Sequence, residues 1–376
     1  MKRTLITGGA GFIGSRLSRE LLAAGHEVRA LDTLSPQVHG SDRRRPPALP
    51  AEVELQLGDV RDPAAVARAL DGVDAVYHLA ALVGVGQSMY RIAEYTSVNA
   101  VGTAVLLDAL KQRPVERLIV ASSMSVYGEG LYRGGDGELV RDAERTRDAL
   151  RAGRWEPLGR AGEPLTPIPT TEDKSPSLAS VYALSKYDQE RLCLVTARAY
   201  GFSATALRLF NVYGPHQALS NPYTGVLAIF GARLLNRRPP MLFEDGRQRR
   251  DFVSVHDVAR AFVLALDGDR ARAADGQVLN VGSGRASSVL EVARLMADAV
   301  GAPEIQPVVT GRHRAGDIRH CFADVTEARA LLGFEAEVTL DRGLAELAAW
   351  LDGQVVPSMD RDDDARAELD RWGLTS

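Results

Sequence analysis

The feature that most restricts the fold of this chain is a run of closely spaced glycines, T-G-G-A-G-F-I-G, at residues 7–14. The run follows a short apolar segment, Thr4–Thr7, and leads into an amphipathic pattern over Phe12–Ala24. Glycine allows a tight turn and a close backbone approach to a diphosphate, and the start of a helix offers free N–H groups. The strand, loop and helix therefore predict a dinucleotide-binding turn. Its expected contact residues are Gly8, Gly11, Phe12, Ile13 and Gly14.

Short apolar runs alternate with helical patterns up to about residue 210. Strands separated by helices form a parallel sheet that helices cover on both faces. The pattern thus predicts an α/β fold with a doubly wound parallel sheet. The expected strands are Thr4–Thr7, Glu27–Leu31, Val53–Leu57, Ala75–Leu79, Arg117–Ala121 and Ala204–Phe210, and the expected helices are Phe12–Ala24, Ala64–Leu70, Ile92–Gln112 and Val181–Tyr200.

The alternation is interrupted between residues 129 and 180, where Gly, Pro, Arg and Glu are frequent and apolar residues are scattered. We interpret this stretch as an insertion that is partly helical around Val140–Leu150. Such an insertion is either a functional lid or a decoration of the surface, and the sequence favours neither.

Two carboxylates follow the second and third expected strands. Asp32 can accept both ribose hydroxyls of an adenosine and would repel a 2′-phosphate, which favours NAD over NADP as the cofactor. Asp59, in G-D-V at 58–60, can contact the adenine amino group or cap the helix that begins near Pro63. Both roles of Asp59 stay open.

A serine run and a later tyrosine–lysine pair form the candidate catalytic set. Ser123 lies just beyond the strand Arg117–Ala121, and Tyr182 and Lys186 are one helical turn apart on the same helix face. A nearby ammonium group favours the phenolate form of a tyrosine, whose ordinary pKa is about 10. Tyr182 is therefore a candidate base for a sugar hydroxyl, with Ser123 bonded to the same oxygen.

Composition excludes several classes of protein. The formal net charge of −4 argues against a nucleic-acid partner, and no apolar run approaches the roughly 20 residues of a membrane span. Two cysteines are too few for a disulfide framework or a Cys-rich metal site, and no histidines show metal-ligand spacing. We therefore expect a cytoplasmic protein with no metal and no membrane partner.

The chain resembles the extended short-chain dehydrogenase/reductases, and among them the nucleotide-sugar epimerases and dehydratases. The resemblance covers nearly the whole chain to about Leu351. The matching motifs are T-G-G-A-G-F-I-G (7–14), Asp32, G-D-V (58–60), H-L-A-A (78–81), V-N-x-x-G-T (98–103), S-S-M-S-V-Y-G (122–128), Y-A-L-S-K (182–186), R-L-F-N-V-Y-G-P (208–215) and R-D-F-V-S-V-H-D (250–257).

The resemblance implies a particular division of the chain. A Rossmann-type NAD-binding domain would span residues 1–210 and contain the insertion at 129–180. A smaller α/β domain for a nucleotide-diphosphate sugar would span 211–351, with about 250–282 returning to the Rossmann body, and a tail would follow over 352–376.

The resemblance assigns the family's functional roles to the residues of this chain that stand at the same places in the matching motifs. The triad would be Ser123, Tyr182 and Lys186, and the last two would also contact the cofactor. Further cofactor contacts would be Asp59, Val60, Leu79, Ala80, Ala81 and Asn99, and substrate contacts would be Gln87, Ser88, Ser125, Asn211, Arg250, Arg314 and Asp317. Two planar guanidinium groups match a diphosphate, and Asp317 would hold the nucleotide ribose. The resemblance also implies a homodimer through the helices near 92–112 and 181–200.

The resemblance also bears on the reaction. Dehydratases of the family place Asp-Glu directly after the catalytic Ser or Thr, whereas Met124 and Ser125 stand here and cannot do that acid/base work. Epimerisation at C4 needs only proton transfer by Tyr182, a transient 4-keto sugar and an NAD that is regenerated. Val83 and Cys321 depart from the UDP-galactose epimerase pattern. The loop G-V-G-Q-S (84–88) and the segment F-E-D-G (243–246) look more like epimerases of dTDP-6-deoxyhexoses such as dTDP-L-rhamnose.

The prediction is therefore an NAD-dependent nucleotide-sugar 4-epimerase, an isomerase. Three alternatives stay open: a UDP-glucose or UDP-glucuronate 4-epimerase, a nucleotide-sugar dehydrogenase, reductase or decarboxylase, and a non-catalytic NAD(H)-sensing protein. The last has no need of all three triad residues.

Overall fold

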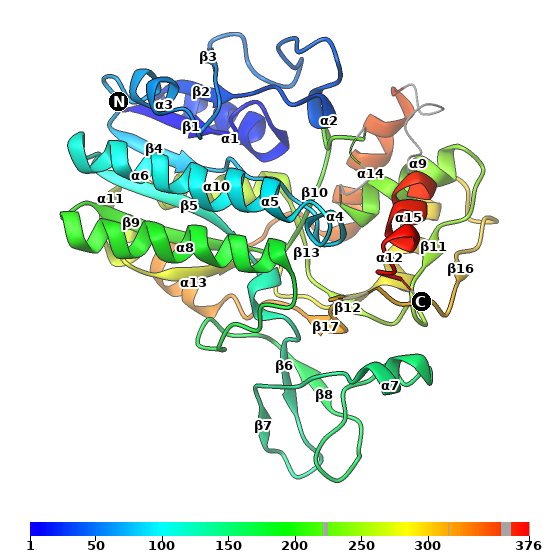
Figure 1. Ribbon diagram of the computed structural model, residues 1–376. Coiled ribbons are helices and arrows are strands. Elements are labelled where there is room, and N and C mark those ends of the chain that lie inside the picture. Colours follow the sequence, from blue (N-terminus) through cyan, green and yellow to red (C-terminus); the bar gives the residue numbers. More distant parts are fainter. Residues whose placement is uncertain (220, 222–224, 315, 355–361, 376) are drawn as a thin grey trace.

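A seven-stranded parallel sheet lies at the centre of the molecule, in the order β14-β9-β5-β4-β1-β2-β3 (Figure 1). The computed structural model describes residues 1–219, 221, 225–314, 316–354 and 362–375. The strand order reverses between β1 and β4, which is where sheets of this kind bind their ligands. The strands are β1 (Arg3–Thr7), β2 (Glu27–Asp32), β3 (Glu54–Leu57), β4 (Ala75–His78), β5 (Arg117–Ser123), β9 (Ser203–Leu209) and β14 (Val278–Val281).

Helices cover both faces of this sheet, each over its own cluster of buried apolar side chains. One face carries α1 (Phe12–Ala23), α10 (Val255–Leu264) and α13 (Thr326–Leu332). The other face carries α3 (Pro63–Ala69), α6 (Gly102–Gln112) and α8 (Val181–Tyr200). The predicted doubly wound α/β fold is thus confirmed. Shorter helical turns are α2 (Pro36–His39), α4 (Val85–Ser88), η2 (Met124–Tyr127) and α11 (Gly268–Ala273).

The helix predicted over Ile92–Gln112 is present, but its middle is π-helical rather than α-helical. The segment consists of α5 (Ile92–Tyr95), a π-helical turn η1 (Thr96–Val101) and α6. A π turn adds one residue to a helical turn and shifts the register of the apolar face, and a segment of six residues is too short for periodicity to reveal that shift. Such turns are frequent at functional sites, and η1 holds the buried Asn99.

The insertion is mostly strand and loop. It contains a small antiparallel sheet in the order β7-β6-β8, which hangs below the main body in Figure 1. Its elements are β6 (Leu131–Arg133), β7 (Leu139–Val140), α7 (Arg147–Arg151) and β8 (Thr166–Ile168). The helix predicted around Val140–Leu150 is therefore wrong over most of its length, because Val140 pairs with Tyr132 in a strand ladder.

A smaller unit follows β9, with a core of its own between three helices. These helices are α9 (Val226–Leu235), α12 (Val289–Ala299) and α14 (Leu340–Asp352). Its strands form the pairs β10 (Asn211–Tyr213) with β13 (Phe252–Ser254) and β11 (Met241–Leu242) with β16 (Val308–Val309), and the sheet β15 (Ser287–Ser288), β12 (Arg249–Arg250) and β17 (His320–Cys321). The division near residue 210 stays a prediction.

The last described helix, α15 (Asp362–Arg371), lies beside the α4 region (Figure 1). The Trp372 ring stacks on Tyr90 at 6.1 Å and 6°. The Tyr90 hydroxyl donates a hydrogen bond of 2.7 Å to Glu368. Of the predicted tail, residues 355–361 and 376 lie outside the described residues.

Candidate active site

The glycine loop leaves the start of α1 open. A Cβ atom at Gly9 would lie 2.6 Å from the Ala30 Cβ, and one at Gly14 would lie 2.6 Å from the Gly8 carbonyl oxygen. Within the described chain, no side chain caps α1 at Gly11, and its first turn carries no acidic residue. The free N–H groups and the dipole of this helix start therefore fit the diphosphate of a dinucleotide.

Asp32 ends β2 beside this loop. Its carboxylate accepts hydrogen bonds from the backbone N–H of Ala10, at 3.1 Å, and of Leu34, at 2.9 Å. These bonds fix the carboxylate where a ribose-binding acid is needed. Together with the glycine cradle, this position fits NAD.

Asp59 lies beside Arg61 and does not cap helix α3. The Arg61 guanidinium donates to it at 2.6 Å and lowers the pKa of the Asp59 carboxyl. Helix α3 is capped instead by Asp62, which accepts from the Ala64 N–H at 2.9 Å. The capping role of Asp59 is therefore wrong, and its adenine contact stays a prediction, as does the contact of the neighbouring buried Val60.

Ser123 and Tyr182 lie together although they are far apart in the sequence. Ser123 ends β5 and accepts hydrogen bonds from the Ser125 backbone N–H, at 3.2 Å, and hydroxyl, at 2.9 Å. Tyr182 stands in the first turn of α8, half-buried. Burial raises the pKa of the Tyr182 phenol, and the nearby Ser123 hydroxyl opposes that rise.

Lys186 follows one turn later on α8 and is only 3% exposed. Its Nζ donates to the Gln189 Oε1 at 2.7 Å. Burial lowers the pKa of Lys186 to about 8. The lysine is thus a buried cation whose direct partner is a neutral amide.

Gln189 anchors this lysine to the sheet. Its Nε2 donates to the Thr103 hydroxyl at 3.0 Å and the Ala80 carbonyl at 3.2 Å, and it lies 3.1 Å from the His78 Nε2. Burial lowers the pKa of His78 to about 3, so the ring is neutral. Sequence analysis missed Gln189, although its position three residues after Lys186 puts it on the same helix face.

The end of β4 lies against the glycine loop. A Cβ at Gly8 would lie 2.9 Å from the Ala80 backbone nitrogen. Leu79 and Ala81 flank this contact and are half-buried. Asn99 fixes the next residue, because its Oδ1 accepts from the Leu82 N–H at 2.7 Å. These positions suit a nicotinamide site, and the individual contacts stay predictions.

Gln87 and Ser88 are held within the protein. The Ser88 hydroxyl donates to the Val85 carbonyl at 2.6 Å and accepts from the Tyr182 backbone N–H at 3.0 Å. The Gln87 Oε1 accepts from the Tyr95 hydroxyl at 3.2 Å. The structure thus shows that Ser88 positions the start of the catalytic helix, and the sugar contacts of both residues stay predictions.

Arg250, Arg314 and Asp317 converge, as their assigned roles require. The two arginines reach the Asp317 carboxylate at 3.4 Å and 3.0 Å. Burial alone would raise the pKa of Asp317, but the arginines outweigh it and lower the pKa to about 2. Nearby, the Asn211 Oδ1 is buried and has no hydrogen-bond partner among the described residues, so it is an open acceptor.

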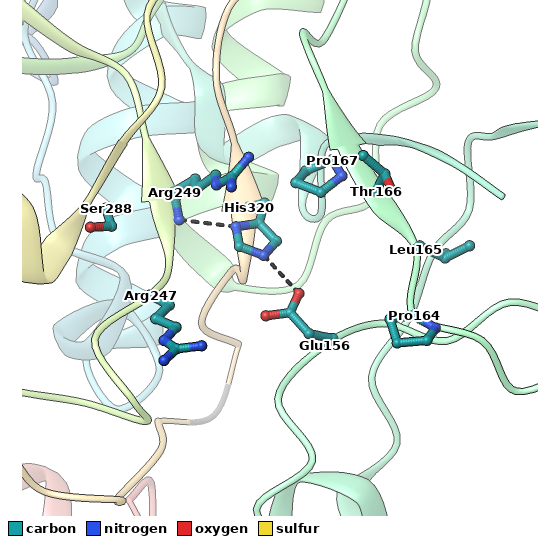
Figure 2. Close-up of a pocket in the computed structure, with 9 residues that line it drawn as sticks. All are labelled: Glu156, Pro164, Leu165, Thr166, Pro167, Arg247, Arg249, Ser288 and His320. Carbon is teal, nitrogen blue, oxygen red and sulfur yellow. Dashed lines mark hydrogen bonds and ion pairs between the residues drawn. The ribbon is translucent and has the colours of Figure 1, made fainter. Parts of the chain in front are cut away.

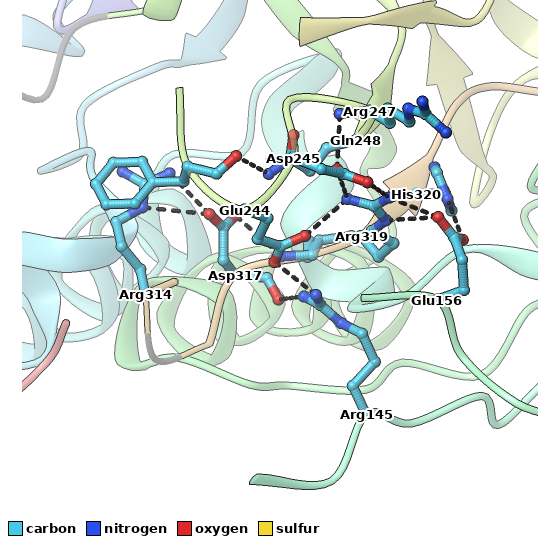
Figure 3. A network of polar contacts seen from close by, with 12 residues as sticks. Arg145, Glu156, Glu244, Asp245, Arg247, Gln248, Arg314, Asp317, Arg319 and His320 are labelled. Atoms are coloured by element: carbon cyan, nitrogen blue, oxygen red, sulfur yellow. Dashed lines mark hydrogen bonds and ion pairs between the residues drawn. The ribbon is translucent and has the colours of Figure 1, made fainter. Parts of the chain in front are cut away.

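A dense ion-pair network joins the insertion to this substrate side (Figure 3). Arg319 is fully buried and pairs with Glu244 at 2.8 Å and with Glu156 of the insertion at 2.5 Å. Arg145 of the insertion pairs with Glu244 at 2.5 Å and donates to the Asp317 carbonyl at 2.7 Å. Sequence analysis missed this network because its partners are up to 172 positions apart.

The described residues contain no group of three or more His, Cys, Asp or Glu placed to hold a metal ion. Among the same residues, no helix combines the length and the apolar character needed to cross a bilayer.

Comparison with known proteins decides the family. The model of the "NAD dependent epimerase/dehydratase family" matches residues 4–282. The chain belongs to this family. The dTDP-L-rhamnose 4-epimerase of Burkholderia thailandensis is 39% identical over 356 residues, which cover 93% of this chain and 95% of the relative.

Solved structures of the family agree. The UDP-glucose 4-epimerase of Thermotoga maritima with UDP-glucose has a TM-score of 0.75 at 30% identity, with 93% of this chain and 98% of that chain covered. The UDP-glucose 4-epimerase of Thermus thermophilus with NAD has a TM-score of 0.74 at 32% identity, with 94% and 100% covered. The Rossmann-type fold, the NAD cofactor and the epimerase class are thereby confirmed.

Proposed function

We propose that this chain is a nucleotide-sugar 4-epimerase that acts on a dTDP-6-deoxyhexose such as dTDP-L-rhamnose. The observation that carries the proposal is the pair of Tyr182 and the buried Lys186, one turn apart on α8, the helix that packs against β5, which ends at Ser123. The dehydratase positions hold Met124 and Ser125, and the Ser125 hydroxyl is bonded to Ser123. The relative from Burkholderia thailandensis supports the dTDP-6-deoxyhexose.

Tyr182 is the base of the proposed reaction. Its phenolate takes the proton from the sugar O4 while Ser123 donates a hydrogen bond to the same oxygen. When bound, NAD⁺ supplies a hydride acceptor for C4 and afterwards a hydride donor. The 4-keto sugar turns over in the cleft, and Tyr182 returns the proton to O4 of the epimer.

Lys186 favours the phenolate form of Tyr182, which the proposed proton transfer needs. Burial raises the pKa of the phenol, so a positive charge is needed to favour the phenolate. With a pKa of about 8, Lys186 is mostly protonated at neutral pH and supplies that charge. Gln189 holds its ammonium without neutralising it.

The nucleotide binds at the Arg250–Asp317 end of the proposed site. Arg250 and Arg314 take the diphosphate, because the planar guanidinium group matches phosphate oxygens. Asp317 accepts from the nucleotide ribose, and the open Asn211 Oδ1 accepts from the substrate.

We also propose a homodimer through α8 and the segment around α5. Leu184, Leu192 and Val195 are 47%, 37% and 58% exposed, at a spacing that puts them on one face of α8. Ile92 and Val101 are exposed by 54% and 51% on the neighbouring segment. Such an apolar surface favours burial against a second copy. Sedimentation should show a dimer, and Val195→Glu should yield a monomer.

We also propose that the protein is located in the cytoplasm. Both cysteines, Cys193 and Cys321, are buried free thiols. Free thiols persist in reducing compartments, and the cytoplasm is the main one.

The test is conversion of a panel of dTDP- and UDP-sugars, with and without added NAD, followed by mass spectrometry and proton NMR. We expect a product of unchanged mass with an inverted C4 signal, formed from the dTDP-6-deoxyhexoses. Tyr182→Phe should lower kcat by about 10³-fold, a typical contribution of a general base, and should still bind NAD. A product lighter by water or carbon dioxide, or full activity of Tyr182→Phe, would contradict the proposal.

A further inference from the structure

The small sheet β15-β12-β17 has two faces with different environments. Neighbouring side chains of a strand point to opposite faces, whereas residues paired in register point to the same one. Arg250 pairs with Cys321 and shares the face of Asp317. Arg249 pairs with His320 and with Ser288, so these three occupy the opposite face.

That opposite face forms the floor of a cavity of about 460 Å³ (Figure 2). The insertion supplies the facing wall through Glu156 and the run Pro164–Pro167, and Arg247 completes the lining. The volume lies within the roughly 300–1,000 Å³ of typical ligand sites. The cavity therefore has the size of a ligand site, and it lies on the face of β12 opposite to Arg250.

Two guanidinium groups in this cavity lack a counter-charge. The side chains of Arg247 and Arg249 make no hydrogen bond or ion pair with any described residue, whereas the adjacent Arg319 pairs with three carboxylates. The one carboxylate in the lining, Glu156, is already bonded to Arg319 and, at 2.8 Å, to His320. The cavity therefore presents an uncompensated positive charge.

The wall of the cavity is fixed in place before any ligand arrives. Glu156 is held by the fully buried Arg319, and the Gly130 N–H donates to the His320 carbonyl at 2.8 Å. The Thr170 N–H donates to the Phe322 carbonyl at 2.8 Å, which ties the far end of the insertion to the same segment. A pre-formed wall lowers the ordering cost of binding.

We propose that this cavity, between the insertion and β12, is a second binding site, and that its ligand is a small sugar phosphate. A guanidinium group suits a phosphate group, which it can contact bidentately, and the cavity offers one on either side of the His320–Glu156 pair (Figure 2). Pro164, Leu165 and Pro167 offer an apolar surface to the C–H face of a sugar ring. The Ser288 hydroxyl, which accepts from the Glu291 N–H at 3.1 Å, keeps its own proton to donate to a sugar oxygen.

This site is separate from the nucleotide-sugar cleft, because Arg249 and Arg250 point to opposite faces of one strand. It does not depend on the proposed reaction.

The test is calorimetric titration of the full chain with glucose 1-phosphate as the probe, with dTDP present to fill the cleft. We expect one saturable site per chain, at least a tenfold loss of affinity in the double variant R247A/R249A, and unchanged binding in R250A. Exposed Arg342 gives the matched control R342A, which should bind like the wild type.

Neutral glucose separates phosphate recognition from adventitious sugar binding and does not depend on any variant's folding. We expect it not to bind at concentrations that saturate with glucose 1-phosphate. The proposal is overturned if dTDP displaces the probe, if R247A/R249A binds as tightly as R342A, or if glucose binds equally well.

Discussion

Two buried polar clusters in this protein differ in the charge of the groups that surround their central cation. The direct partner of Lys186 is the neutral amide of Gln189, and burial lowers the pKa of the lysine to about 8 although the nearby Glu190 opposes that fall. Around Arg319 and Asp317, cations and carboxylates alternate, and the pKa of Asp317 falls to about 2. The first arrangement leaves a group near its titration point, as proton transfer needs. The second keeps the Asp317 carboxylate charged well below neutral pH, as a charged binding site needs.

The largest effect should follow from removing the central cation of the second cluster. Arg319→Leu leaves Glu244, Asp245 and Glu156 without their shared partner, and breaking a buried pair in this way costs about 3–5 kcal/mol. Urea denaturation should report this loss. Arg342→Leu, at an exposed position, should stay within about 0.5 kcal/mol of the wild type. A loss in Arg319→Leu no larger than that would show that the network does not hold the insertion.

The next prediction adds a carboxylate beside Lys186, so that its neutral surroundings become like those of the charged cluster. Gln189→Glu puts a carboxylate beside Lys186, 2.7 Å from Nζ in the present geometry. The pKa of Lys186 should rise from about 8 toward its ordinary 10.5, by about 1–3 units. The ammonium then survives to higher pH, so the alkaline limb of the kcat profile should move up. Gln189→Leu removes the partner without adding charge and should move that limb down. An unshifted profile in both variants would refute the link between Lys186 and the pH profile.

A third prediction concerns the pH dependence of stability. The pKa of Asp317 is lowered from 3.8 to about 2, so its stabilisation is complete above pH 3.8 and is lost as pH falls toward 2. Asp317→Asn should therefore cost about 2 kcal/mol at pH 7 and clearly less at pH 3. Denaturation at the two pH values measures the difference, and an equal cost at both would contradict the charge pairing.

The smallest effect should come from the C-terminal segment. Trp372 stacks on Tyr90, near Gln87, and Arg312 pairs with Asp370. Trp372→Ala removes an aromatic pair that contributes about 1 kcal/mol, so KM should rise roughly fivefold while kcat holds. A fall in kcat with KM constant would show that the segment acts on the chemistry instead.

The predictable parts of the molecule were those that short stretches of sequence encode. The loop at Gly8–Gly14, the helix Val181–Tyr200 and the sheet strands depend on local patterns, and the fold class followed from their alternation. Tyr182 and Lys186 share a helix, so their common face could be derived from spacing alone. Ser123 joined them as a candidate because it lies in a serine run just beyond a predicted strand.

The rest depended on contacts that local patterns do not encode. Strands of two or three residues, such as Leu139–Val140, are too short to show a period. The π turn around Asn99 spans only six residues, too few to show its altered register as a period. The Arg319 network joins residues as far apart as Glu156, 163 positions away, and only the folded chain brings them together.

The most direct test of the proposed reaction is the fate of a deuterium atom at C4. The protein is incubated in ordinary water with dTDP-L-rhamnose deuterated at that carbon, and the product is examined by NMR and mass spectrometry. Oxidation and reduction at C4 through NAD predict an epimer of unchanged mass that keeps its deuterium at the inverted carbon. Loss of the deuterium to solvent, or inversion at another carbon, would contradict the account.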